Sequence, residues 1–277
     1  MKKSSNLAHN AASPSTAVLI PVFNDGPGLK RTLASLADDD GTFDVVIVDD
    51  GSVPPLPQMM TCGEHSVTVI RQQRNMGIAK ALNRGLIYVL SRGYNFVARI
   101  DARDLAVAGR MAMQEAYLRE HPSCGLVGSF VDFVDEQGAL RHRHRPPAGH
   151  EQIMRQMHIN NCILHASVMM RAGILRLSGF YPEASGTACE DYVLFVGLAR
   201  YCRLAVIPKV LTVCEDSKTG ISAKRRHEQQ LSRLRIQYKY FDPRTAVSYY
   251  GFIRTLVAMM TPRLAVLWYK RSLRSRG

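Results

Sequence analysis

The sequence predicts an α/β fold, in which a single domain with a mostly parallel central sheet flanked by helices continues into a basic helical C-terminal extension. Short runs of β-branched and aromatic residues alternate with segments of helical periodicity, and nearly all of the net positive charge lies in one terminal segment. The expected parts are a disordered polar tail over 1–15, a first half over 16–125, a second half over 126–222 and the extension over 223–277.

Four buried strands are expected in the first half, and each is a short apolar run: TAVLIPVF, FDVVIVDD, SVTVIRQ and YNFVARID. After the first run, Leu29, Leu33 and Leu36 fall on one face of a helix that Asn24 or Asp25 can cap. After the third run, IAKALNRGLIYVLSRG has a second helical pattern. Strands and helices that alternate at this spacing predict parallel pairing, and ligands then bind beyond the carboxyl ends of the strands.

The rest of the chain is less regular. The stretch RHRHRPP over 141–147 is expected to be loop, and GTACEDYVLFVGLARY is expected to be a helix that begins near Glu190. From about residue 224 a helical pattern returns, with an apolar stripe on one face formed by Phe252, Ile253, Leu256, Val257 and Met260.

The net charge of +13 is concentrated near the C-terminal end. Residues 221–277 hold 13 Lys or Arg against two acids, Glu228 and Asp242. No nucleic-acid motif is present, and an apolar stripe has no use on a phosphate backbone, so nucleic acid is not expected as a partner. A basic amphipathic helix favours contact of 224–277 with an anionic membrane surface. The alternative is that the stripe packs on the rest of the domain.

Cysteine usage and the N-terminus bear on location. The six cysteines form no C-x-x-C pair, which favours separate reduced thiols. Two lysines near the start are followed by no apolar stretch, and no run approaches the ~20 apolar residues of a membrane span. These features predict a cytoplasmic protein, with peripheral attachment to the inner face of the membrane left open.

The common phosphate-binding loops are absent. The chain has neither G-x-x-x-x-G-K-[ST] nor G-x-G-x-x-G after its first strand, which argues against a P-loop ATPase and a dinucleotide oxidoreductase. The predicted strand ends instead carry carboxylates. Such groups accept hydrogen bonds from a base or a ribose, or hold a metal that binds phosphate.

Five segments, VLIPVFND, VVIVDDGS, NMGIAKALNRGL, VARIDARDLAVAGRM and CEDYVLF, occur in the order and spacing of the family 2 glycosyltransferases of GT-A fold. The resemblance covers roughly residues 16–222. It implies inverting transfer of a sugar from a nucleotide-sugar donor to a hydroxyl of a glycan or lipid-linked glycan, with bacterial cell-surface or exopolysaccharide synthesis as the expected setting. The first half would bind the donor, and the second half would bind the acceptor and carry the catalytic base.

The resemblance also implies roles for single residues. Asp191, in CED, matches the catalytic base. Phe23 would stack on the nucleotide base and Asp50 would accept its N–H, while Asp101 is the first acid of the family's Asp-x-Asp. The donor-binding set implied in this way is Pro21, Phe23, Asn24, Asp50, Lys80 and Asp101, and Arg103 is added to it on the basis of its charge.

Two positions depart from the family pattern. Arg103 occupies the second acid of Asp-x-Asp, and Ser217 falls where a metal-binding histidine is expected. Because both changes remove ligands, a bound Mg²⁺ or Mn²⁺ is in doubt. Three hypotheses stay open. Arg103 clamps the departing diphosphate in place of the metal; or it turns away and Asp101 with Asp104 still bind the cation; or the site has decayed in a nucleotide-sugar-binding or scaffold protein.

Each of these residues also has a structural alternative. Asp50 could organise a turn, Asp191 could be a carboxylate that favours the start of a helix, and Arg103 could belong to an ordinary ion pair. His165, in an apolar run, is expected to be a hydrogen-bonded interior histidine.

Overall fold

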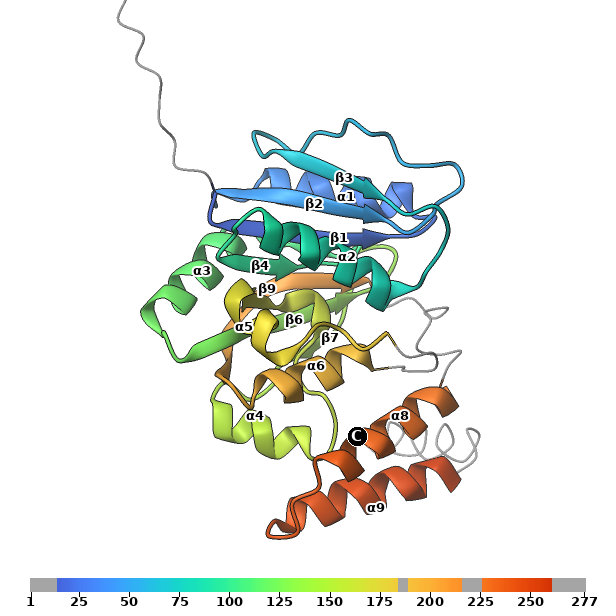
Figure 1. Cartoon of the computed structure of the whole chain (residues 1–277), viewed down its shortest axis with the longest axis vertical. Helices are drawn as coiled ribbons and strands as arrows, with labels where there is room; N and C mark the ends of the chain where they lie inside the picture. The colour runs from blue at the N-terminus through green and yellow to red at the C-terminus, as the bar shows by residue number, and fades with distance from the viewer. Residues whose placement is uncertain (1–13, 184–188, 216–225, 261–277) are drawn as a thin grey trace, which may run out of the picture.

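The structure is a computed structural model that describes residues 14–183, 189–215 and 226–260 (Figure 1). Most of the predicted N-terminal tail therefore lies outside the described residues. So do Ser217, the predicted boundary near residue 222 and the end of the basic extension.

The described strands form one sheet in the order β3-β2-β1-β4-β8-β6-β9-β5, with β7 paired to β6. The four strands predicted in the first half are confirmed, and all pair in parallel. Their bounds are β1 Thr16–Val22, β2 Phe43–Asp49, β3 Val67–Arg71 and β4 Phe96–Arg99. Because these strands are parallel, the residues that follow β1, β2 and β4 meet at one edge of the sheet.

The second half makes the sheet mixed. Strand β8 pairs antiparallel with both β4 and β6, β6 runs parallel to β9, and β5 runs antiparallel to β9. The strands of this half are β5 Leu105–Ala106, β6 Cys124–Val134, β7 Leu140–His144, β8 Met169–Arg171 and β9 Arg203–Glu215. The expected parallel pairing therefore holds for the first four strands and does not extend through the second half.

The loop expected over RHRHRPP is wrong for residues 141–144, which belong to strand β7 (Leu140–His144) on the edge of β6. Its side chains are largely exposed, so the segment carries no apolar alternation. Cross-strand contacts stabilise it instead. Arg143 pairs with Asp132 at 2.6 Å, and the ring of His142 stacks on Phe133 with centroids 4.4 Å apart. Charged side chains are usual on an exposed sheet edge.

Helices cover both faces of the parallel half. On one face, α1 (Gly26–Ala37) buries Leu29, Leu33 and Leu36 against strand residues such as Ile20 and Ile47. On the other face, α2 (Ile78–Ser91) packs on the alternate strand residues. Asp25 caps α1 by accepting from the Gly28 N–H at 3.1 Å. The predicted layering is thus confirmed, since alternate residues of a strand point to opposite faces.

The remaining helices surround the second half and lead into the extension. Helix α6 begins at Glu190, as expected. The bounds are α3 Arg110–Glu120, α4 His150–Met157, the short 3₁₀ helix η1 His165–Ser167, α5 Ala172–Ser178, α6 Glu190–Leu198, α8 Arg226–Lys239 and α9 Ala246–Met260. Figure 1 shows α8 and α9 beside α4, at the end of the molecule opposite β3.

The predicted helical extension is confirmed over its described part. Considering only the described residues, most of the apolar stripe of α9 is exposed, namely Ile253, Leu256, Val257 and Met260, while Phe252 is half-buried. Among the helices that the structure describes, none is both long enough and apolar enough to cross a membrane.

Candidate active site

The end of β1 presents an aromatic ring at the carboxyl edge of the sheet. The Phe23 side chain is 46% exposed there, although the strand before it is buried throughout. Pro21 lies within that strand opposite Val48 and is itself buried, so its place is in the sheet beneath the edge. An exposed ring at a strand end is available for stacking on a planar ligand.

Asn24 ties the loop after β1 to the loop after β2. Its backbone has a positive φ of 52°, which Asn tolerates better than most residues. The Asn24 N–H donates to Ser52 Oγ at 2.9 Å, and its Oδ1 accepts from the Val53 N–H at 2.8 Å. These bonds fix the backbone beside Phe23.

Asp50 is buried where β2 ends, and it organises the segment before α2. Its Oδ1 accepts from Gln72 Nε2 and the Met76 N–H, both at 2.8 Å, and its Oδ2 accepts from the Gly77 N–H at 2.9 Å. Asp50 therefore does organise a turn, as its structural alternative predicted. A carboxylate oxygen can accept two hydrogen bonds, so Oδ2 retains capacity for a donor on a ligand. Lys80 is half-buried in the first turn of the helix that this segment starts.

Asp49 holds the other side of the same turn. It is fully buried and accepts from the N–H groups of Ser52 at 2.8 Å and Leu56 at 3.1 Å, and from Arg71 at 2.5 Å. Burial raises the pKa of the Asp49 carboxyl, but these hydrogen bonds and the Arg71 charge outweigh it, and the net pKa is lowered.

Arg103 is held in an ion pair. It has a positive φ of 89°, and its backbone N–H donates to Thr32 Oγ1 at 3.0 Å. Its Nε donates to Oδ2 of Asp25 at 2.6 Å, and this bond raises the pKa of the guanidinium. Its terminal nitrogens have no hydrogen-bond partner within the described residues. A fork of free N–H donors remains for an anion.

Arg99 was not predicted from the sequence, yet it is the buried cation of the site. It donates from Nη1 to Oδ2 of Asp101 at 2.7 Å, and its Nη2 pairs with Oδ1 of the same carboxylate. The available signal was an arginine inside the apolar run YNFVARID, because a charge inside a buried strand requires a partner.

The carboxylates near Arg103 do not form a ligand cluster. Both oxygens of Asp101 are bound by Arg99. Asp104 is only 9% exposed, and its burial, together with the charge of Asp101, raises its pKa to about 7. Across the part of the chain that the structure describes, no group of three or more His, Cys, Asp or Glu could hold an ion. A divalent cation at this edge would therefore be held by fewer than three protein ligands together with the phosphates of the donor, as is common for Mg²⁺.

Asp191 lies in the first turn of α6, half-buried. Its Oδ2 accepts from Asn161 Nδ2 at 2.7 Å, and its Oδ1 accepts from the Tyr192 N–H at 2.8 Å. Burial raises the pKa of the Asp191 carboxyl, while these donors and the charge of Arg99 oppose the rise. Arg99 therefore binds Asp101 directly, and its charge also acts on Asp191.

His165 is an interior histidine, as expected. It is buried, and its Nε2 lies 2.7 Å from the Tyr181 hydroxyl. Burial raises the pKa of the Tyr181 hydroxyl; the charge of Arg99 opposes this rise and that of Asp191 adds to it. Asn161 is the further residue that sequence reasoning missed, since a single polar residue in an irregular segment gives no signal of its partner.

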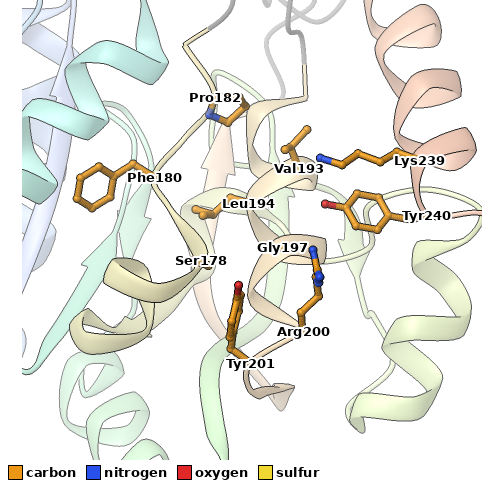
Figure 2. A pocket seen from close by; sticks show the side chains of 10 residues that line it. All are labelled: Ser178, Phe180, Pro182, Val193, Leu194, Gly197, Arg200, Tyr201, Lys239 and Tyr240. Atoms are coloured by element: carbon orange, nitrogen blue, oxygen red, sulfur yellow. The ribbon is translucent and has the colours of Figure 1, made fainter.

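A separate hollow lies between α6 and the end of α8, where Lys239 and Tyr240 face Val193 and Arg200 (Figure 2). None of the residues predicted for donor binding or catalysis lines it. The site at the carboxyl edge is therefore defined by its strand ends and their side chains, and this hollow is a different feature.

Comparison with known sequences is consistent with this geometry. The sequence model of Glycosyl transferase family 2 matches residues 17–177. The amylovoran biosynthesis glycosyltransferase AmsE of Erwinia amylovora is 27% identical over 267 residues, covering 92% of this chain and 98% of that protein.

Solved structures share the fold. S. aureus TarS superposes with a TM-score of 0.64 at 18% identity, covering 87% of this chain and 71% of that one. The mannosyltransferase PcManGT of Pyrobaculum calidifontis, solved with GDP-Man and Mn²⁺, gives a TM-score of 0.58 at 18% identity, covering 90% and 70% of the two chains. The expected GT-A fold is thus confirmed.

Proposed function

This chain belongs to glycosyltransferase family 2 and is a glycosyltransferase, and from that premise we propose that it inverts the anomeric configuration of a sugar as it moves that sugar from a nucleoside diphosphate to a hydroxyl acceptor. The observation that carries the proposal is the buried Arg99 at the end of β4, which binds both oxygens of Asp101 and whose charge opposes the rise in the pKa of Asp191 at the start of α6. We infer that this donor-side carboxylate and this candidate base serve one site.

The donor would lie along the carboxyl edge of β1, β2 and β4. Phe23 supplies an exposed ring for stacking on the base, and Oδ2 of Asp50 has capacity for a base N–H. Pro21 and Asn24 support this edge from the sheet and the loop, and Lys80 adds a cation at the start of α2. TarS has been solved with UDP-GlcNAc and PcManGT with GDP-Man, which supports a nucleotide sugar as the donor class here.

In the proposed reaction Asp191 acts as the general base. Its carboxylate accepts the proton of the acceptor hydroxyl as the acceptor oxygen forms a bond to the anomeric carbon. The bond from that carbon to the diphosphate oxygen breaks on the opposite face, and the diphosphate leaves with the electron pair. Asn161 and the Tyr192 N–H fix the orientation of the carboxylate, which is the source of catalytic advantage for a base of modest strength.

The leaving diphosphate develops negative charge, and we assign its stabilisation to Arg103. Both oxygens of Asp101 are bound by Arg99, whereas the terminal nitrogens of Arg103 have no hydrogen-bond partner among the described residues. A planar guanidinium can bind two phosphate oxygens at once. Mn²⁺ accompanies GDP-Man in PcManGT, so metal dependence is a direct point of comparison.

The proposed acceptor is a glycan or a lipid-linked glycan of bacterial cell-surface or exopolysaccharide synthesis. The name of the E. amylovora relative supports this setting, because it refers to amylovoran biosynthesis. A non-catalytic nucleotide-sugar-binding protein is the alternative function that the departure at Arg103 favours.

Donor binding can be tested with the full chain by thermal shift against UDP-, GDP- and dTDP-sugars, each with EDTA and with Mn²⁺. The proposal predicts a rise in melting temperature with one nucleotide class, and the same rise in EDTA. No shift with any donor, in either condition, would count against it.

A further inference from the structure

Helix α9 is inverted with respect to an ordinary surface helix. Its buried residues are Ser248, Gly251 and Thr255, which are small, and two of them are polar. Its large apolar side chains lie on the other side. We call this side the outward face, and it is formed by Tyr250 (57% exposed), Ile253 (57%), Leu256 (39%) and Met260 (85%).

The inward side is packed closely, so the outward face is not a consequence of a loosely placed helix. A Cβ at Gly251 would lie 2.1 Å from the His158 carbonyl oxygen, which means that the two backbones are in direct contact. Ser248 Oγ lies 2.9 Å from His158 Nδ1, and Gln230 of α8 donates to the Ala258 carbonyl oxygen at 3.1 Å. These contacts fix the rotation of α9 and direct its apolar side chains away from the domain.

An exposed apolar face of this kind marks a surface that another body covers. The basic residues around the outward face indicate the kind of partner. Arg254 and Arg244 are exposed beside or just before the outward face. After Met260 the sequence has no Asp or Glu and five basic residues: Arg263, Lys270, Arg271, Arg274 and Arg276. A second copy of the chain would bring like charges together, whereas anionic lipid headgroups attract each of them.

We propose that the outward face of α9 docks on an anionic lipid bilayer, with the helix parallel to the surface, its apolar side chains below the headgroups and the flanking arginines among the phosphates. This is the geometry expected of an amphipathic interfacial helix. The inference goes beyond the proposed sugar transfer and does not depend on it, because it rests on α9 and the basic residues that flank it in the sequence.

The test is cosedimentation of the full chain with vesicles of phosphatidylcholine, and with vesicles that also contain phosphatidylglycerol, in the absence of any donor. The test variant is the triple change Ile253→Ser, Leu256→Ser and Met260→Ser. The matched control is the triple change Met59→Ser, Leu140→Ser and Leu177→Ser, which removes three exposed apolar side chains from other parts of the surface. Circular dichroism and melting temperature check that each variant is folded.

The wild-type chain and the control should bind the anionic vesicles and bind neutral vesicles more weakly, with affinity falling as salt rises. The α9 variant should lose about tenfold or more in affinity. Equal binding by the α9 variant and the control would overturn the proposal, and so would the absence of wild-type binding to anionic vesicles. A wild-type dimer that the α9 variant converts to monomer would also overturn it, because the face would then belong to a second copy. Since no donor is present, none of these outcomes bears on nucleotide-sugar binding.

Discussion

Arg103 Nε donates to Asp25 Oδ2 at 2.6 Å, and the same aspartate caps helix α1 through the Gly28 N–H at 3.1 Å. The cation that replaces the second acid is therefore anchored at the N-terminal end of a helix. The anchor uses only Nε, so the guanidinium is oriented while its terminal nitrogens stay available. This arrangement suits a clamp for a diphosphate better than a residue that has turned away from the site.

Replacement of Arg103 tests that clamp. Arg103→Ala should lower kcat/KM by roughly 10- to 100-fold, since a hydrogen bond to a charged group contributes about 1.5–3 kcal/mol. Arg103→Lys keeps the positive charge but lacks the planar guanidinium, so its kcat/KM should lie between those of the wild type and Arg103→Ala. Arg119→Ala, an exposed arginine on α3, is the matched control and should leave the rate unchanged.

The same clamp predicts how the enzyme responds to chelation. Wild-type activity should persist in EDTA, whereas Arg103→Asp restores the second acid and should make activity depend on added Mg²⁺ or Mn²⁺. Rates of sugar transfer measured with and without chelator show whether each protein requires a metal ion. Complete loss of wild-type activity in EDTA would show that the arginine does not replace the metal.

Asn161 is a positioning residue for the proposed base. Its Nδ2 donates to Asp191 and helps keep the pKa of that carboxyl from rising further. Because the base must be ionised, activity should fall as the pH drops through the raised pKa of Asp191. Asn161→Ala removes a donor that favours the ionised form, so this acidic limb should move to higher pH, with kcat down about tenfold.

The pH profile of kcat/KM separates this role from general damage to the loop. Asn160→Ala is the matched control, because its amide donates to a backbone carbonyl and not to Asp191. The control should keep the wild-type profile. An Asn161→Ala enzyme whose acidic limb stays at the wild-type pH would refute the positioning role.

Phe23 should contribute to donor affinity through stacking. Phe23→Ala should weaken binding of the nucleotide sugar by roughly 10- to 100-fold, given about 1–3 kcal/mol for a base stacked on an aromatic side chain. Phe23→Tyr keeps the ring and should bind almost normally. Calorimetric titration with the free nucleoside diphosphate measures the effect directly, and equal affinities for all three proteins would exclude stacking at this position.

Asp49 makes a prediction about stability. It is buried, its hydrogen bonds hold the turn over 50–56, and its pKa is lowered on balance. A carboxyl with a lowered folded pKa stabilises the protein above its unfolded pKa and loses this contribution as the pH falls through the folded value. Asp49→Asn should therefore cost roughly 1–3 kcal/mol in the free energy of unfolding at pH 7.

Urea denaturation at several pH values checks the sign. The gap between wild type and Asp49→Asn should stay constant above about pH 5 and narrow below the unfolded Asp value near 3.8. A gap that widens in acid would mean that the native state does not favour ionised Asp49.

The first half of the fold could be predicted because each strand is apolar along its length and each helix buries one face, as Leu29, Leu33 and Leu36 do in α1. The second half could not. Strand β7 is stabilised by pairing with β6 and by surface contacts such as Arg143 with Asp132, so its sequence has no apolar signal. The antiparallel insertion of the three-residue strand β8 depends on tertiary packing that no local pattern encodes.

The candidate site likewise has a part that could be predicted from the sequence and a part that could not. Motif order placed Phe23, Asp50 and Asp101 at strand ends, where the structure has them. Partnerships between distant residues, such as Arg103 with Asp25 and Asn161 with Asp191, join positions 78 and 30 residues apart and could not be deduced from one sequence.

The central claim is that Asp191 serves as the base in transfer from a nucleotide sugar, and its most direct test is release of nucleoside diphosphate, followed by mass spectrometry of the products. Wild type and Glu151→Gln, an exposed acid on α4, should release nucleoside diphosphate. Asp191→Asn should bind the donor with an affinity within about threefold of wild type and release it at least about a thousandfold more slowly. Turnover by Asp191→Asn at the wild-type rate, or donor bound by the wild type and left intact with every acceptor glycan offered, would contradict the account.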